Sequence, residues 1–138
     1  MITYLIDTSA YVHLGTDPVA QRRWDAEIET GAVGMCEPTR AEVLFMATGP
    51  DDREEIDEDL TALFAPVRVP KDAWRWVETA QYKLTRKGQH RAAGVVDLLL
   101  CATAVHHGLT VLHRDNDFAT VARVLKDVDQ QDVRHLGG

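Results

Sequence analysis

Residues 95–117 read VVDLLLCATAVHHGLTVLHRDND, and this stretch decides the fold class. The nearly all-apolar run at 95–107 predicts a buried helix. Gly108 is a typical residue for ending a helix, because glycine adopts the left-handed conformation without a steric penalty. The apolar residues 110–113 then predict a buried strand, followed by the polar run from Arg114 to Asp117.

The same alternation of strand and helix extends along the rest of the chain. Further strands are predicted at 2–6, 32–36, 67–69 and, as a possible last strand, 133–136. Further helices are predicted at 18–29, 38–48, 51–64, 71–87 and 118–126. No short hairpin turn joins two strands, so we expect a mostly parallel sheet of four to five strands with helices on both faces. The fold class is therefore α/β.

Length and composition predict one domain over residues 1–138. The apolar fraction of 45% and the charged fraction of 27% are typical of a soluble globular protein. No run approaches the roughly 18 apolar residues of a membrane span, and residues 1–7 predict a strand where an export signal would stand. Cys36 and Cys101 lie in apolar runs without metal-binding spacing. We expect a cytoplasmic protein with no membrane association.

Three acids are predicted at one edge of the sheet. Asp7 follows the first strand, and Asp115 and Asp117 follow the strand at 110–113. Ligands of open parallel sheets bind beyond the carboxyl ends of the strands, which is where these side chains are expected. Each acid also has a structural explanation, since Asp7 could cap a helix and the other two could be turn residues.

Two further acids lie in predicted helices. Asp97 is embedded in apolar sequence, where an ionised carboxylate is costly unless it is paired or binds a metal. A helix-capping role for Asp97 is possible, but Val95 and Val96 before it favour the functional interpretation. Glu42 has a stronger structural alternative, because Thr39-Arg40-Ala41-Glu42 matches a capping box.

The five acids together predict a metal site. Clustered carboxylates repel one another, and their ionisation is suppressed unless a cation compensates. Oxygen ligands without Cys or His ligand spacing indicate Mg²⁺ or Mn²⁺ in preference to zinc. One or two such ions can activate a water and stabilise the charge that develops during attack on a phosphodiester.

The ordered motifs resemble those of the PIN-domain ribonucleases, and within them the VapC toxins of bacterial toxin–antitoxin pairs. The matching motifs, which span the whole chain in order, are Leu5-Ile6-Asp7-Thr8-Ser9, Glu42, Asp97 and His113-Arg114-Asp115-Asn116-Asp117-Phe118. The resemblance implies an α/β/α sandwich, a homodimer and inhibition by a VapB antitoxin. It also implies RNA cleavage that depends on Mg²⁺ or Mn²⁺, with tRNA or another structured RNA as the first substrate to consider.

The resemblance also implies roles for individual residues. The expected catalytic residues are Asp7, Thr8, Ser9, Glu42, Asp97 and Asp115. The expected metal ligands are Asp7, Asp97, Asp115 and, as a frequent fifth acid of the family, Asp117. Which of the two hydroxyls beside the first acid assists the reaction is left open.

The net charge of −7, from 15 basic and 22 acidic residues, is unusual for a nucleic-acid binder. An acidic protein that cleaves RNA needs local cations for the phosphates. The densest basic stretch is Arg86, Lys87, His90 and Arg91. These residues could contact RNA, or they could form a solvated helix end. Trp74, Trp76 and Tyr82 in the preceding helix could stack on bases, although core or dimer packing is the favoured interpretation.

Other functions fit the sequence less well. A phosphatase of the haloacid dehalogenase type needs a second Asp where Ser9 stands, and no glycine-rich nucleotide-binding motif is present. A PIN-like fold kept only as a binding scaffold has no reason to retain every expected acid. A PIN nuclease outside toxin–antitoxin pairs is the remaining alternative.

Overall fold

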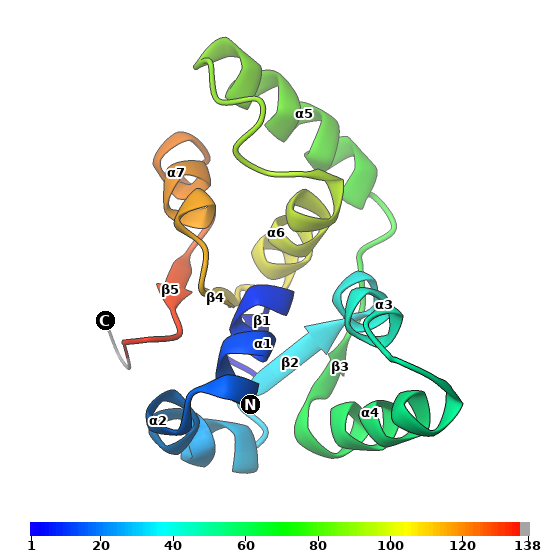
Figure 1. Cartoon of the computed structure of the whole chain (residues 1–138). Helices are drawn as coiled ribbons and strands as arrows, with labels where there is room; N and C mark the ends of the chain where they lie inside the picture. Colours follow the sequence, from blue (N-terminus) through cyan, green and yellow to red (C-terminus); the bar gives the residue numbers. More distant parts are fainter. Residues whose placement is uncertain (136–138) are drawn as a thin grey trace.

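Strands and helices alternate from one end of the chain to the other in the computed structural model, which describes residues 1–135. The strands are β1 (Tyr4–Ile6), β2 (Val33–Cys36), β3 (Ala65–Val67), β4 (Thr110–His113) and β5 (Gln130–Asp132). The helices are α1 (Thr8–Thr16), α2 (Pro18–Glu29), α3 (Glu37–Phe45), α4 (Pro50–Leu63), α5 (Ala73–Arg86), α6 (Val95–His107) and α7 (Asn116–Val124). Figure 1 shows their arrangement.

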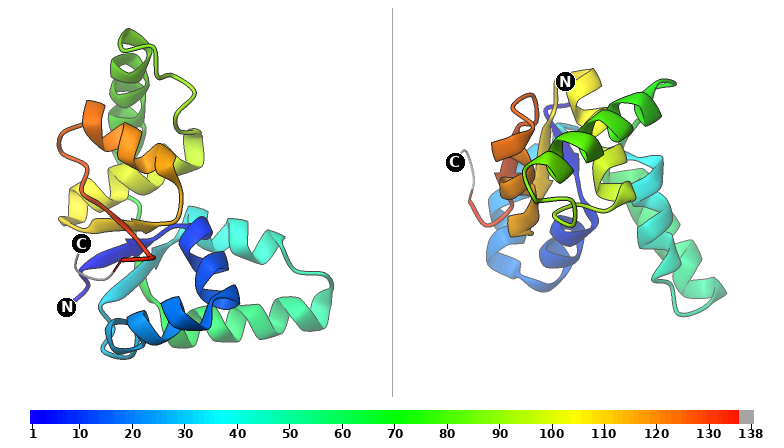
Figure 2. Two further views of the ribbon diagram at one scale, coloured as in Figure 1. Left: turned by 60° about the vertical axis from the view of Figure 1, so that its left-hand side comes forward. Right: turned by 90° about the horizontal axis from the view of Figure 1, so that it is seen from above.

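The five strands form one parallel sheet in the order β3-β2-β1-β4-β5. Helices α5, α6 and α7 lie on one side of this sheet, and α1 to α4 lie on the other (Figure 2). Two separate apolar clusters fill the interfaces: Leu5 belongs to the cluster under α5, α6 and α7, whereas Ile6 belongs to the cluster that contains Trp24. The α/β/α sandwich is confirmed.

Most predicted elements are present, with ends that differ by a few residues. The helices at 18–29 and 95–107 and the strand at 110–113 have the predicted ends. The third strand lies at 65–67, two residues earlier than predicted, and contains Pro66. Proline removes a backbone donor, which an edge strand such as β3 tolerates.

The predicted strand at 133–136 is wrong, and its last residue lies outside the described part of the chain. The strand is Gln130–Asp132, whose three polar residues lack the apolar pattern used for the prediction. This edge strand is half-buried, and its side chains are engaged in hydrogen bonds. Val133 follows it as a fully buried residue, and its carbonyl accepts a hydrogen bond from Trp24 Nε1 at 2.6 Å.

The strand order determines where a site can form. From β1 the sheet extends through β2 on one side and through β4 on the other, so the topological switch point lies between β1 and β4. Ile6 pairs with Leu112 at the carboxyl ends of these strands, and Asp7 N donates to Leu112 O at 2.9 Å. No helix within residues 1–135 is long and apolar enough to cross a membrane.

Candidate active site

Asp7 lies at the switch point and is 6% exposed. It is the N-cap residue of α1, where its Oδ2 accepts hydrogen bonds from Ser9 N at 3.0 Å and from Ser9 Oγ at 2.5 Å. The capping role considered from the sequence is therefore real. It coexists with a position at the centre of the acidic cluster, because a cap at a strand end directs the carboxylate to the edge of the sheet.

The hydroxyls of Thr8 and Ser9 have different partners. Ser9 Oγ accepts a hydrogen bond from Arg114 N at 3.0 Å, which joins the segment after β1 to the segment after β4. Thr8 Oγ1 donates to Glu42 Oε1 at 2.7 Å and so joins α1 to α3. Ser9 therefore contacts the first acid, whereas Thr8 orients Glu42.

Glu42 does not form a capping box with Thr39. Helix α3 begins at Glu37 with Cys36 as its N-cap residue, which puts Thr39 in the first turn and Glu42 well inside the helix. Thr39 is fully buried, and its hydroxyl lies 3.5 Å from Cys36 Sγ. The contact with Thr8 is thus the interaction that holds Glu42.

Asp97 is the third residue of α6 and is half-buried. Its Oδ2 accepts a long hydrogen bond of 3.4 Å from Gly94 N, so it takes part in capping the helix, which the sequence made less expected. Burial, followed by the charge of Asp7, raises the pKa of Asp97 to about 6. The charges of Glu42 and Asp115 also raise this pKa, and the bond from Gly94 opposes them.

The charges that raise the pKa of Asp97 indicate which acids lie near it. Asp7, Glu42 and Asp115 are each close enough to Asp97 to raise its pKa. Asp115 is half-buried and is the N-cap residue of α7, where it accepts a hydrogen bond from Asp117 N at 3.0 Å. Asp117 is exposed and is not among the charges that act on Asp97. The fold thus brings four of the five acids together and leaves Asp117 at the margin.

The donor set fits Mg²⁺ or Mn²⁺ in its chemistry, because it consists of carboxylate oxygens with nearby hydroxyls. Within residues 1–135, however, no three His, Cys, Asp or Glu side chains are positioned to ligate one ion. The carboxylates lie near one another, and binding an ion would therefore require their side chains to move closer together.

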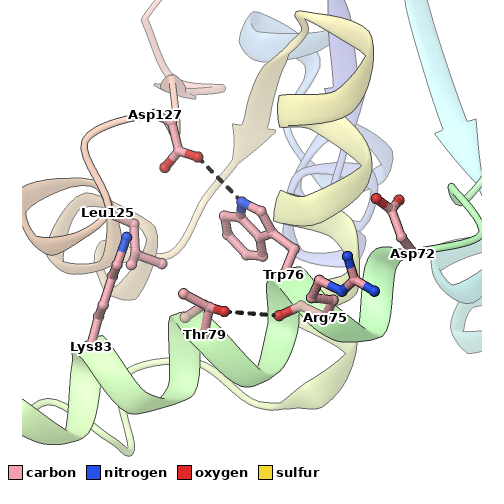
Figure 3. Close-up of a pocket in the computed structure, with 8 residues that line it drawn as sticks. Asp72, Arg75, Trp76, Thr79, Lys83, Leu125 and Asp127 are labelled. Carbon is pink, nitrogen blue, oxygen red and sulfur yellow. Dashed lines mark hydrogen bonds between the residues drawn. The ribbon is translucent and has the colours of Figure 1, made fainter.

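The predicted basic stretch divides into two parts. His90 and Arg91 line a cavity of about 310 Å³ together with Asp117 and Thr120 of α7. Arg86 and Lys87 line a different cavity, between α5 and the end of α7. Figure 3 shows a third pocket, which lies nearer the start of α5 and is lined by Trp76 among other residues.

His113 is a site residue whose role the sequence analysis missed. It is 2% exposed, its Nδ1 accepts a hydrogen bond from Asp115 N at 3.0 Å, and its Nε2 lies 2.6 Å from Gln130 Oε1. An accepting Nδ1 requires the proton on Nε2, which then donates to Gln130. His113 thereby fixes the backbone of Asp115 to β5. A histidine among the buried residues of a strand was the available signal.

The chain matches a known protein family. The model of the PIN-domain family matches residues 4–124 of this chain. The chain belongs to the PIN-domain family. Ribonuclease VapC6 of Mycobacterium tuberculosis is 43% identical over 97 residues, which cover 70% of this chain and 76% of the relative. Ribonuclease VapC2 of the same species is 41% identical over 121 residues, which cover 86% and 84%. The chain is thus a member of the VapC group within the family.

Solved structures share the fold at low sequence identity. VapBC2 from Rickettsia felis, bound to a DNA fragment from the promoter, has a TM-score of 0.77 and 11% identity and covers 95% of this chain and 98% of that one. VapBC-1 from nontypeable Haemophilus influenzae has a TM-score of 0.77 and 16% identity and covers 97% and 100%. These likenesses confirm the α/β/α architecture of the family.

The raised pKa of Asp97 predicts a pH-dependent loss of stability. The folded protein holds this proton more tightly than the unfolded chain, so the free energy of unfolding falls as the pH rises from about 4 to about 6. Asp97→Asn should remove this fall and stabilise the metal-free protein at pH 7 by about 1–2 kcal/mol, allowing for solvent screening of a half-buried group.

Urea unfolding in EDTA between pH 4 and pH 7 measures this difference, with the exposed Asp117→Asn as the matched control. Identical pH profiles for the Asp97→Asn variant and the unmodified protein would contradict the coupling.

The contacts of His113 predict a graded effect of substitution. Asn keeps an acceptor near Nδ1, whereas Leu leaves the amide of Asp115 and the side chain of Gln130 without their partner. We expect His113→Leu to destabilise the protein by about 1–3 kcal/mol more than His113→Asn, the cost of unsatisfied buried polar groups. Denaturant midpoints measure the difference, and equal stabilities would show that these hydrogen bonds contribute little.

Proposed function

We propose that this protein is a metal-dependent endoribonuclease and the toxin of a VapBC toxin–antitoxin pair. The observation that carries the proposal is the convergence of Asp7, Glu42, Asp97 and Asp115 at the switch point, with the pKa of Asp97 raised by the other three. A fold that keeps carboxylates together against their repulsion is typical of a metal site. Curated relatives carry the name ribonuclease, which supports RNA as the substrate.

In this mechanism Asp7, Asp97 and Asp115 would hold one or two Mg²⁺ or Mn²⁺ ions, and Asp117 could contribute as a further ligand. The metal, when bound, lowers the pKa of a water and stabilises the charge that develops on the phosphate. Glu42 Oε1 is held by Thr8, so Oε2 is the atom that accepts a proton from the attacking water. Ser9 keeps Asp7 and the segment after β4 in register.

The proposal extends to partners and location. Several solved structures with this fold are VapBC complexes, which supports a VapB-type antitoxin as the inhibitor. We further propose a homodimer that acts in the cytoplasm on tRNA or another structured RNA. Arg91 and His90, which line a cavity with Asp117, are proposed to contact the phosphate backbone of the RNA.

Metal binding distinguishes the nuclease from a catalytically silent scaffold. Mn²⁺ at about a hundred times its dissociation constant should stabilise the protein by about 2.7 kcal/mol, a rise of several degrees in melting temperature. Asp97→Asn should lose most of this rise and all RNA cleavage while remaining folded. Thermal melts with and without Mn²⁺ and a cleavage assay are the measurements. A melting temperature that does not respond to millimolar Mn²⁺ favours the scaffold.

Glu42→Gln separates proton transfer from structure. Gln keeps an oxygen that accepts the hydrogen bond of Thr8, so the stability should change by less than about 0.5 kcal/mol. The kcat of RNA cleavage should fall by about 10²- to 10⁴-fold, because the amide cannot take a proton. Thr8→Val, which removes the orienting hydroxyl alone, is the matched variant and should show a smaller loss. Unchanged cleavage by Glu42→Gln would remove Glu42 from the mechanism.

A further inference from the structure

The basic residues of this acidic protein are concentrated in one segment. Residues 68–91 hold seven of the 15 lysines and arginines but only two of the 22 acids, so this segment carries a charge of +5 and the rest of the chain −12. The segment contains α5, which packs on α6 and extends away from the sheet (Figure 1). A polyanion is therefore attracted to α5 and repelled from the remaining surface.

The basic side of α5 forms a groove with the end of α7. Lys83, Arg86, Lys87 and Lys126 line a cavity of about 470 Å³ there, with Asp127 as its single acid. All four cations are exposed, and within residues 1–135 none of them is in an ion pair. Free cations around a groove are a surface suited to a phosphate backbone.

An aromatic ring completes this groove. Tyr82 lines the same cavity and is 62% exposed, so its ring is accessible to a ligand. The guanidinium of Arg86 lies 5.8 Å from the centre of the ring and donates a hydrogen bond to the tyrosine hydroxyl at 3.0 Å. This contact holds the Tyr82 ring and the Arg86 guanidinium together. A positively charged groove with an aromatic platform is how proteins bind single-stranded nucleic acid, since unpaired bases stack on the ring.

The groove lies within reach of the acidic cluster. Asp117 and Thr120 in the first half of α7 line the cavity with His90 and Arg91, and Val124 at its end lines the groove. Asp115 of the acidic cluster is the N-cap residue of the same helix, and the rise of an α-helix puts it about 13 Å from Val124.

We propose that the groove formed by Tyr82, Lys83, Arg86, Lys87 and Lys126 binds a single-stranded segment of the RNA that extends from the bond that is cleaved. The proposal rests on the ribonuclease function and assigns these residues to the binding of the unpaired part of the substrate. Duplex RNA hides its bases from Tyr82. An acidic protein partner would use the cations but would not need the ring.

The test uses the full chain and a fluorescent 12-nucleotide single-stranded RNA of mixed sequence. Lys83→Gln/Arg86→Gln and Tyr82→Ala are the variants, and Tyr82→Phe keeps the ring. Arg22→Gln/Arg53→Gln removes the same charge from exposed positions of α2 and α4 and is the matched control. A duplex of the same length is the comparison RNA.

In EDTA we expect Tyr82→Ala to weaken binding of the 12-mer by about tenfold, while Tyr82→Phe and the control bind normally. The double variant should lower the slope of log affinity against log salt by about 1.4, for two lost phosphate contacts. With Mn²⁺ the same variants should raise KM for the 12-mer, whereas the control variant should leave it unchanged.

Two results would contradict the proposal that this groove binds single-stranded RNA. One is 12-mer binding that is unaffected by the variants, the outcome expected if the cations serve a protein partner. The other is duplex binding that is tighter than single-strand binding and equally sensitive to the variants. If the unmodified protein binds RNA as described but cleaves none with Mn²⁺, the ribonuclease function fails while the binding surface stands, so the two failures are distinguishable.

Discussion

The parallel pairing of β1 with β4 is the constraint on which the site depends. Ile6 lies opposite Leu112, so the residues that follow both strands lie at the same edge of the sheet. From this pair the sheet extends through β2 on one side and through β5 on the other. The amide of Asp7 donates to Leu112 O, and the amide of Arg114 donates to Ser9 Oγ. These bonds join the segment that carries Asp7 to the segment that carries Asp115, so the sheet determines how far apart the two acids lie.

The sheet and its helices hold several carboxylates near one another despite their like-charge repulsion. Asp97 shows the cost, since burial and three neighbouring carboxylates raise its pKa to about 6. Neutral hydroxyls supply part of the compensation, because Thr8 donates to Glu42 and Ser9 donates to Asp7. The net charge of −12 outside residues 68–91 is the electrostatic background of the cluster, whereas that segment carries +5.

The fold was largely predictable because its signals are local. Helix α6 followed by Gly108 and β4 has apolar runs and a stop residue that act within a few positions, and their ends were predicted correctly. The prediction failed at the edges of the sheet. Gln130–Asp132 forms a strand because β4 offers a free edge, and Pro66 is tolerated in β3 because no strand lies beyond it. Such pairing depends on distant neighbours, which a local pattern does not contain.

The sequence by itself determined the family and the α/β class, because motif order and strand ends are readable along the chain. Only the tertiary structure decided what holds each acid. It replaced the capping box of Glu42 by a contact with Thr8, left Asp117 exposed at the margin and brought His113 to the amide of Asp115. The reason is physical: a strand end directs a side chain to one edge of the sheet, but hydrogen-bond partners and mutual charge depend on elements that meet only when the sheet is assembled.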